Sequence, residues 1–530
     1  MASASTAFNH CNSAKTRRSG CRKPIECEDG FLNGMEFSVH KKRFDASRGR
    51  HSVGRLGKYE KLLFLIFFLS LPLCNPWVRG DGVGYYAFGR SLLIQHNLNF
   101  QKDWLAANTS FRMGRTDPGG HVLAEQYTPT GHLDNHFSIG PAILWSPFLV
   151  MAHVAVRCYD ALGGHVAADG YSEPYLLGMA LGTAVYGFLS VWISFRLARK
   201  YLADRWAFLG ALGIWFASSL PVYMYFNPSW SHAHSAFMVA LFVWYWDRTG
   251  QSRTMLQWMV LGAIAGLMMD VYYPNAILLL LPLLESLGTY WKGTVHTEPK
   301  KTIGPLFLNN VLFAGVTFAA FLPTLVSKKI IYGNYLNFGY IEQWFWASPA
   351  LLRVCFSSEH GLFSWTPITF LAVIGLFLFR RHHRVLASYS ICAFAVYVYV
   401  IGCYQDWDGL SSFGNRFFVS LTVLFVLGLA AFFDRIAHNL NEQRARVLAP
   451  IATAILILWN LGLVFQWGTH LIPARGPISW RDAAYNQFAV VPVRAASTLA
   501  NYLTQRRQLM RHIEEGDVKQ LRSQAPGGSQ

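Results

Sequence analysis

Residues 61–86 read KLLFLIFFLSLPLCNPWVRGDGVGYY, in which an apolar run ends abruptly in a charged, glycine-rich cluster. The 18 residues from Lys61 to Val78 are long enough to cross a bilayer as one helix. The run begins too far from the N-terminus for an ordinary signal peptide, so we interpret it as an uncleaved first span. Basic residues precede it, which predicts that the span runs outward from a disordered cytoplasmic tail, residues 1–60.

The composition of the 530-residue chain also indicates a membrane protein. Hydrophobic residues make up 52% of the sequence and charged residues 14%, about half the charged share of a soluble domain. The 15% of aromatic residues can furnish aromatic belts at two membrane interfaces. These values exclude intrinsic disorder, a coiled coil and a small disulfide-stapled fold, and they predict an all-α polytopic membrane protein.

The net charge of +17 does not indicate nucleic-acid binding. The basic residues lie in the tails and in short loops between apolar runs, not on one face of a compact domain. Charges in such places set the topology and contact anionic head groups of the lipid bilayer. We therefore expect the bilayer as a partner and no nucleic acid.

Apolar runs after the first span predict about eleven transmembrane helices. The further ten are about 175–195, 207–226, 232–247, 256–270, 273–288, 305–327, 361–379, 385–404, 416–433 and 448–467. This register places every strongly basic loop in the cytoplasm. The short run 141–156 contains Pro141 and Pro147, and a crossing there would put the basic loop Arg196–Arg205 outside. We therefore expect 141–156 to be a juxtamembrane helix at the outer interface, within a long outer loop, 79–174.

The same register divides the chain into three parts and gathers five polar clusters on the outer face. The parts are the tail 1–60, a membrane domain at 61–470 and a C-terminal extracytoplasmic tail at 471–530. The clusters are 79–86, 227–234, 270–275, 357–361 and 404–417. Ionisable groups at span ends are costly unless they are solvated or used. Because they lie on one side, they favour an enzyme site over a secondary transporter or lipid flippase, which needs such groups near the bilayer midplane.

Four strings in these regions carry a family resemblance. They are DGVGYY at 81–86, NHFSIGPA at 135–142, HGLFSWTP at 360–367 and WDGLSSFGNRF at 407–417. In this order, over residues 60–470, they resemble the GT-C superfamily of integral-membrane glycosyltransferases, which includes protein O-mannosyltransferases and aminoarabinose transferases. The resemblance implies a hexosyl- or pentosyltransferase of the cell inner membrane, with its active site on the extracytoplasmic face. It would transfer a sugar from a polyprenyl phosphate to a glycan, lipid or protein acceptor.

The resemblance also assigns roles to residues of the outer clusters. Asp81 would be the catalytic base and Arg416 would hold the donor phosphate. Independently of the resemblance, Lys328 and Lys329 are basic residues on the predicted outer side, which makes them candidates for further phosphate contacts. The residues alone favour a turn aspartate next to glycine for Asp81 and an interfacial arginine for Arg416. A sugar between the two would separate them by about 8–12 Å, given roughly 3 Å per contact. The alternative is a direct ion pair in the resting enzyme, which would have to open for donor binding.

The remaining candidates for binding the donor or its sugar are polar or aromatic side chains of the same clusters. They are Tyr85, Tyr86, Asp270, Glu359, His360 and Asp408. Many relatives carry two adjacent acidic residues in the first loop, whereas Gly82 follows Asp81 here. We therefore predict neither a metal site nor another cofactor.

Overall fold

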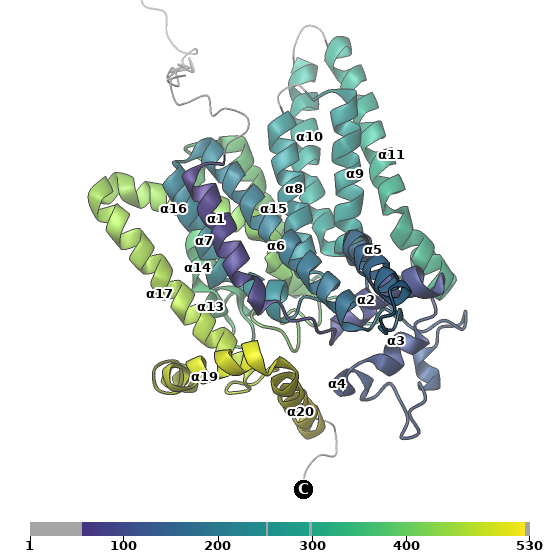
Figure 1. Ribbon diagram of the computed structural model, residues 1–530. Coiled ribbons are helices and arrows are strands. Elements are labelled where there is room, and N and C mark those ends of the chain that lie inside the picture. Colours follow the sequence, from purple (N-terminus) through teal and green to yellow (C-terminus); the bar gives the residue numbers. More distant parts are fainter. Residues whose placement is uncertain (1–55, 251–252, 296–298, 525–530) are drawn as a thin grey trace, which may run out of the picture. The chain divides into compact units, whose positions relative to one another are not determined.

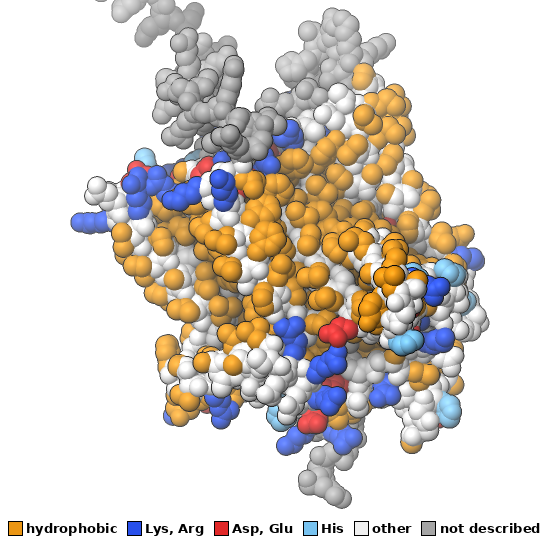
Figure 2. Space-filling view, viewed as in Figure 1, with side chains coloured by type: hydrophobic (Ala, Val, Ile, Leu, Met, Phe, Trp, Pro, Cys, Tyr) orange, Lys and Arg blue, Asp and Glu red, His pale blue; other side chains and the backbone are white. Residues whose placement is uncertain are grey.

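The computed structural model describes residues 56–250, 253–295 and 299–524, so nearly all of the predicted tail 1–60 lies outside the described residues. These residues form helices joined by loops, and they contain no strand beyond three isolated β-bridges (Figure 1). Figure 2 shows a broad belt of hydrophobic side chains, with charged side chains gathered above and below it. A belt of this kind is what a polytopic membrane protein presents to lipid.

Among the described residues, six helical segments are long and apolar enough to cross a membrane. They are α5 (Gly140–Ala161), α6 (Glu173–Tyr201), residues Ile303–Tyr332 of α11 (Pro299–Tyr332), α15 (Arg384–Cys403), α16 (Thr422–Leu440) with the 3₁₀ turn Arg416–Leu421, and α17 (Glu442–Gly468). This agrees with the predicted all-α polytopic class. The count of eleven spans stays a prediction.

The other expected spans contain helices outside this set of six. They are α1 (Lys58–Ser70), α7 (Asp204–Ala217), α8 (His232–Thr249), α9 (Met255–Val271), α10 (Leu280–Val295), α13 (Leu362–Trp365) and α14 (Pro367–Phe379). Helices α8 and α9 cover their expected spans in full, whereas prolines interrupt several of the others. Pro72 follows α1 within a 3₁₀ turn, Pro221 follows α7, and Pro274 precedes α10. Proline restricts the residue before it and supplies no backbone N–H, so it ends or redirects a helix.

Helix α5 includes the run that we expect to be juxtamembrane. It is 22 residues long and continues through Pro147. By length and composition it belongs to the six segments able to span. Figure 1 nevertheless shows it foreshortened, crossing the direction of α9 and α11 rather than running beside them. Its place at the interface stays a prediction.

Helix α16 lies at the centre of the core and fixes one part of the site. It crosses α14 at two glycines, where a Cβ atom on Gly428 would lie 2.0 Å from the Ala372 carbonyl oxygen. Small residues allow membrane helices to approach this closely. The 3₁₀ turn that begins at Arg416 leads directly into α16, so this packing also positions Arg416.

The C-terminal region returns to the first outer loop. It forms α18 (Trp480–Tyr485), α19 (Val491–Thr504) and α20 (Arg506–Gln524), and Figure 1 shows α20 near α4 (Thr109–Arg112). The Asp517 carboxylate of α20 pairs with Arg79, and Glu514 accepts a hydrogen bond from Asn108 at 2.9 Å. The predicted tail 471–530 is therefore largely helical from Trp480 to Gln524, and it packs against the segment that precedes Asp81.

Candidate functional site

Three of the five polar clusters meet around one ion pair. Arg416 Nη1 lies 2.6 Å from Asp81 Oδ2, which joins the cluster at 404–417 to the cluster at 79–86. Trp230, from the cluster at 227–234, donates a hydrogen bond from its indole to the Arg79 carbonyl at 3.0 Å. Residues that are hundreds of positions apart in the sequence thus form one site.

The other two clusters join the same site through their neighbours. His360 Nδ1 lies 3.1 Å from the Asp408 carbonyl oxygen, which attaches 357–361 to 404–417. Ser235, next to the cluster at 227–234, donates to the Asn275 side chain at 3.0 Å. The five clusters that the sequence places on one face therefore form a continuous set of contacts.

Glycines on both sides of Asp81 let its helix approach the neighbouring loop. Asp81 is the first residue of α2 (Asp81–Arg90), and Gly80 before it has a φ of +53°, which favours glycine. A Cβ atom on Gly82 would lie 1.9 Å from Ser229 Oγ. The Gly-Asp-Gly sequence therefore has a packing reason, and it places the carboxylate in the first turn of a helix, where negative charge is favourable.

Arg416 is held by an aromatic ring and by a tight loop. Its guanidinium lies 4.5 Å from the centroid of the Trp230 ring, within the range of a cation–π contact. Gly409, with a φ of +76°, packs against the arginine so closely that a Cβ there would lie 3.1 Å from Arg416 Nε. That Nε is buried and has no hydrogen-bond partner among the described residues. Arg416 therefore keeps capacity to donate to another acceptor.

The observed distance between Asp81 and Arg416 differs from the expected separation of about 8–12 Å for two groups with a sugar between them. They form a direct ion pair at 2.6 Å, with side chains 32% and 12% exposed. Opposite charges that are partly buried attract more strongly than charges in bulk water, because the local dielectric constant is lower. The two groups are therefore adjacent, as a shared site requires, but closer than a bound sugar permits.

The loops that carry Glu359, His360 and Asp408 are tightly wound. His360 and Leu410 both have a φ of +56°, which is uncommon for residues other than glycine. Burial lowers the pKa of His360 to about 4, although the negative charge of Asp408 acts to raise it. The ring is therefore neutral at pH 7. Burial raises the pKa of Glu359, and the Asp408 charge adds to that rise. His360 Nε2 is also buried without a partner in the described chain.

Of the two candidate tyrosines, only Tyr85 lies near the ion pair. Its ring packs against Phe137 at 4.8 Å, and burial raises its pKa, with the Asp81 charge adding to the rise. The Tyr86 hydroxyl donates to the Gly170 carbonyl at 2.6 Å, on the side of α2 that faces the end of the first outer loop. Tyr86 therefore has a structural partner of its own.

Asp270 and the two candidate lysines bind backbone groups elsewhere in the fold. Asp270 is fully buried and accepts from the Thr324 amide of α11 at 3.2 Å. The Lys328 ammonium is buried and donates to the carbonyls of Asn135 and Phe137, each at 2.9 Å. Lys329 is exposed and donates to the Gly333 carbonyl at 2.7 Å. These contacts support the loops around the site, and they are not contacts to the Asp81–Arg416 pair.

Two residues that we did not select from the sequence belong to the site. Trp230 stacks on Arg416, and its place in the polar cluster 227–234 could have indicated this. His136 lies where the charge of Asp81 acts on it, although burial lowers its pKa overall. His136 lies within the string NHFSIGPA at 135–142, which could have indicated its place in the site. No group of three His, Cys, Asp or Glu side chains suited to a metal ion occurs in the ranges described, and metal independence stays a prediction.

The solved structures that are similar to this chain include two archaeal oligosaccharyltransferases. One is the oligosaccharyltransferase of Archaeoglobus fulgidus in complex with zinc and sulfate, with 13% identity and a TM-score of 0.46 over 78% of this chain and 55% of that one. The other is the oligosaccharyltransferase AglB of the same organism with an inhibitory peptide and a dolichol-phosphate, with 13% identity and a TM-score of 0.42 over 89% and 58% of the two chains. The chain spans just over half their length. No family model and no curated protein matches it.

Acidification is expected to destabilise the fold through His360. The unfolded chain takes up a proton near pH 6.5, whereas folded His360 does so only near its pKa of about 4, so stability falls as the pH drops between these values. The full decrease in the free energy of unfolding is about 3 kcal/mol. A decrease of this size lowers the melting temperature by a few degrees. His360→Asn, which tolerates positive φ and does not titrate, should show a smaller decline between pH 6.5 and pH 4.5. The exposed His121→Asn is the control, and an equal decline in all three proteins would contradict this assignment.

Proposed function

We propose that this chain is a membrane glycosyltransferase that moves a sugar from a polyprenyl-phosphate donor to an acceptor hydroxyl outside the cytoplasm. The observation that carries the proposal is the contact between Asp81 and Arg416, around which three of the five polar clusters meet. Displacement of a sugar from a phosphate needs a proton acceptor and a group that binds the departing anion. A carboxylate and a guanidinium supply these two functions.

In the proposed reaction, the acceptor oxygen attacks the anomeric carbon of the sugar while Asp81 accepts the hydroxyl proton. The new carbon–oxygen bond forms as the bond from the same carbon to the phosphate oxygen breaks. The electron pair of the broken bond remains on the phosphate, and Arg416 stabilises the added negative charge. Attack from the side opposite the phosphate inverts the configuration at this carbon.

The resting ion pair gives the donor a role in preparing the base. The donor phosphate and the Asp81 carboxylate are both anions that the Arg416 guanidinium can bind. When phosphate takes the guanidinium, Asp81 loses its charge partner and becomes free to accept a proton. The pair must open by several ångströms, and this couples donor binding to activation of the base.

An apolar groove next to α2 suits the donor's lipid chain. It has a volume of about 320 Å³ and lies between α2 and α5, with Gly89, Leu93 and Ala142 among its lining residues. Gly89 is eight residues after Asp81, or about 12 Å along a helix. A prenyl chain in this groove would therefore have its phosphate within reach of the first turn of α2.

The experiment that tests this function is a transfer assay on the full chain in lipid nanodiscs. The probes are polyprenyl phosphates that carry single labelled hexoses or pentoses, presented with membrane extracts as acceptors. We expect release of polyprenyl phosphate together with label in a product other than water-soluble sugar. Flux of intact labelled lipid across proteoliposomes without release of phosphate would instead support a flippase and overturn the proposal.

We also propose that the site faces the extracytoplasmic side of the inner membrane, because the basic loops lie at the opposite ends of the helices. In a cysteine-free background, a membrane-impermeant maleimide added to intact cells should label His121→Cys and should miss Arg381→Cys until the membrane is opened. Both positions are exposed. The reverse pattern would place the site in the cytoplasm.

A further inference from the structure

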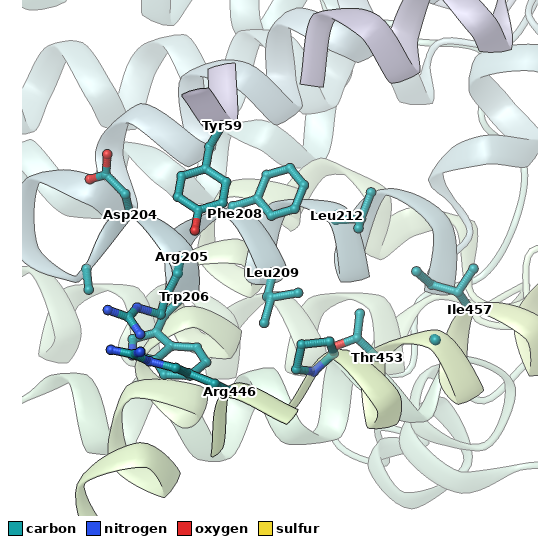
Figure 3. A pocket seen from close by; sticks show the side chains of 13 residues that line it. Tyr59, Asp204, Arg205, Trp206, Phe208, Leu209, Leu212, Arg446, Thr453 and Ile457 are labelled. Atoms are coloured by element: carbon teal, nitrogen blue, oxygen red, sulfur yellow. The ribbon is translucent and has the colours of Figure 1, made fainter. Parts of the chain in front are cut away.

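A cleft at the basic end of the helices lies apart from the Asp81–Arg416 site. It has a volume of about 730 Å³ and is lined by residues of α1, α7 and α17 (Figure 3). Arg205 and Arg446 lie together at one end, and the apolar side chains of Leu209, Leu212 and Ile457 extend away from them. The cleft is therefore amphipathic, with a cationic head and an apolar body.

The head of the cleft carries an excess of positive charge. The guanidiniums of Arg205 and Arg446 share the single carboxylate of Glu442, at 3.0 Å and 3.2 Å. The nearby Asp204 is paired with Arg199 at 2.9 Å, and Arg199 also lies 3.1 Å from Glu60. Arg196 also lies 3.9 Å from Glu60. Four guanidiniums with three carboxylates leave one net positive charge, and Arg205 and Arg446 keep N–H donors for another anion.

The length of the apolar body fits the acyl chains of one leaflet. Arg446 and Ile457 are eleven residues apart on α17, or about 16 Å along a helix. Half of the hydrocarbon core of a bilayer is about 15 Å thick. A chain that begins at the arginines would therefore end near the bilayer midplane.

The cleft also adjoins surface that faces lipid. On α17, the neighbouring side chains of Ile451, Ile455 and Leu458 are 51%, 60% and 67% exposed. Apolar exposure of this extent is expected where a helix borders the hydrocarbon of the bilayer. A lipid can enter from the side without unfolding any helix.

We propose that this cleft binds one anionic phospholipid, with its phosphate between Arg205 and Arg446 and an acyl chain along Leu209, Leu212 and Ile457. The occupant is a bilayer lipid and not a free anion, because the apolar body exceeds what a phosphate alone would contact. This site is independent of the proposed sugar transfer.

Native mass spectrometry of the delipidated full chain tests the preference for charge. The probes are phosphatidylglycerol and phosphatidylcholine with identical acyl chains, and inorganic phosphate as competitor. We expect phosphatidylglycerol to bind more tightly, and Arg205→Gln/Arg446→Gln to weaken it by roughly 30-fold, as for the loss of two basic contacts. Arg381→Gln/Arg384→Gln removes the same charge from two exposed arginines of the same end and should leave binding unchanged.

Photo-crosslinking tests the place of the chain. A phosphatidylglycerol with a diazirine in its acyl chain should label peptides of α7 and α17, and Ala454→Trp, which fills the cleft, should remove this label. Equal binding of the two lipids, equal loss in both double variants, or displacement by millimolar phosphate would overturn the proposal. Crosslinks confined to other helices would overturn it as well, even if charge preference remained.

Discussion

Asp81→Asn should reduce sugar transfer by at least about 100-fold, because an amide cannot accept the proton that a general base removes. Asparagine keeps the shape of the side chain and is accepted at the start of a helix, so the cavity should persist. The substitution also releases Arg416 from its ion pair at 2.6 Å. We therefore expect the donor to bind at least as tightly as in the wild type while turnover is lost.

The measurement separates these two effects by recording donor Kd at equilibrium and transfer in a single turnover. Asp406→Asn removes the same charge from the neighbouring outer loop and is the matched control, expected to retain near-normal transfer. If Asp81→Asn transfers sugar as fast as this control, Asp81 is not the base. If it loses donor binding together with turnover, the competition between Asp81 and phosphate for Arg416 is absent.

Arg416→Ala should lower kcat/KM by about 10²–10³-fold, the range seen when a donor to a developing anion is removed. Both KM and kcat should change, because the guanidinium binds the phosphate in the ground state and stabilises it as it leaves. Arg416→Lys should recover part of the loss, since it keeps the charge but lacks the planar fork and the stacking on Trp230.

The control for this arginine is Arg353→Ala. Arg353 also stacks on a tryptophan and lies 3.8 Å from a candidate carboxylate, Glu359, but its side chain is 66% exposed. Steady-state titration of the donor should show little change in this control. A normal KM in Arg416→Ala, with the loss confined to kcat, would mean that Arg416 does not hold the donor before reaction.

The sequence predicts the partners in the site better than it predicts their geometry. Span ends and loop charge place Asp81 and Arg416 on one face, because topology depends mainly on apolar length and basic residues. Their direct contact depends on the Gly409 loop and on Trp230, which neither periodicity nor composition reveals. Likewise, the prolines that shorten several spans are visible in the sequence, but the turns they create are set by packing.

Burial explains why some candidates do not join the pair. Asp270 and Lys328 are polar residues near predicted span ends, which makes them natural candidates. In the structure, each satisfies backbone groups that belong to a different segment, Thr324 for the aspartate and Asn135 for the lysine. Such partners lie far away in the sequence, and no local pattern identifies them.

The contact between Arg79 and Asp517 joins positions 438 residues apart. At about 5–20 residues per second, a ribosome needs roughly 20–90 s to make the intervening chain. Throughout this interval, the segment just before Asp81 has already been inserted, but its partner on α20 does not yet exist. The outer face can therefore reach its final packing only after the last helices are made.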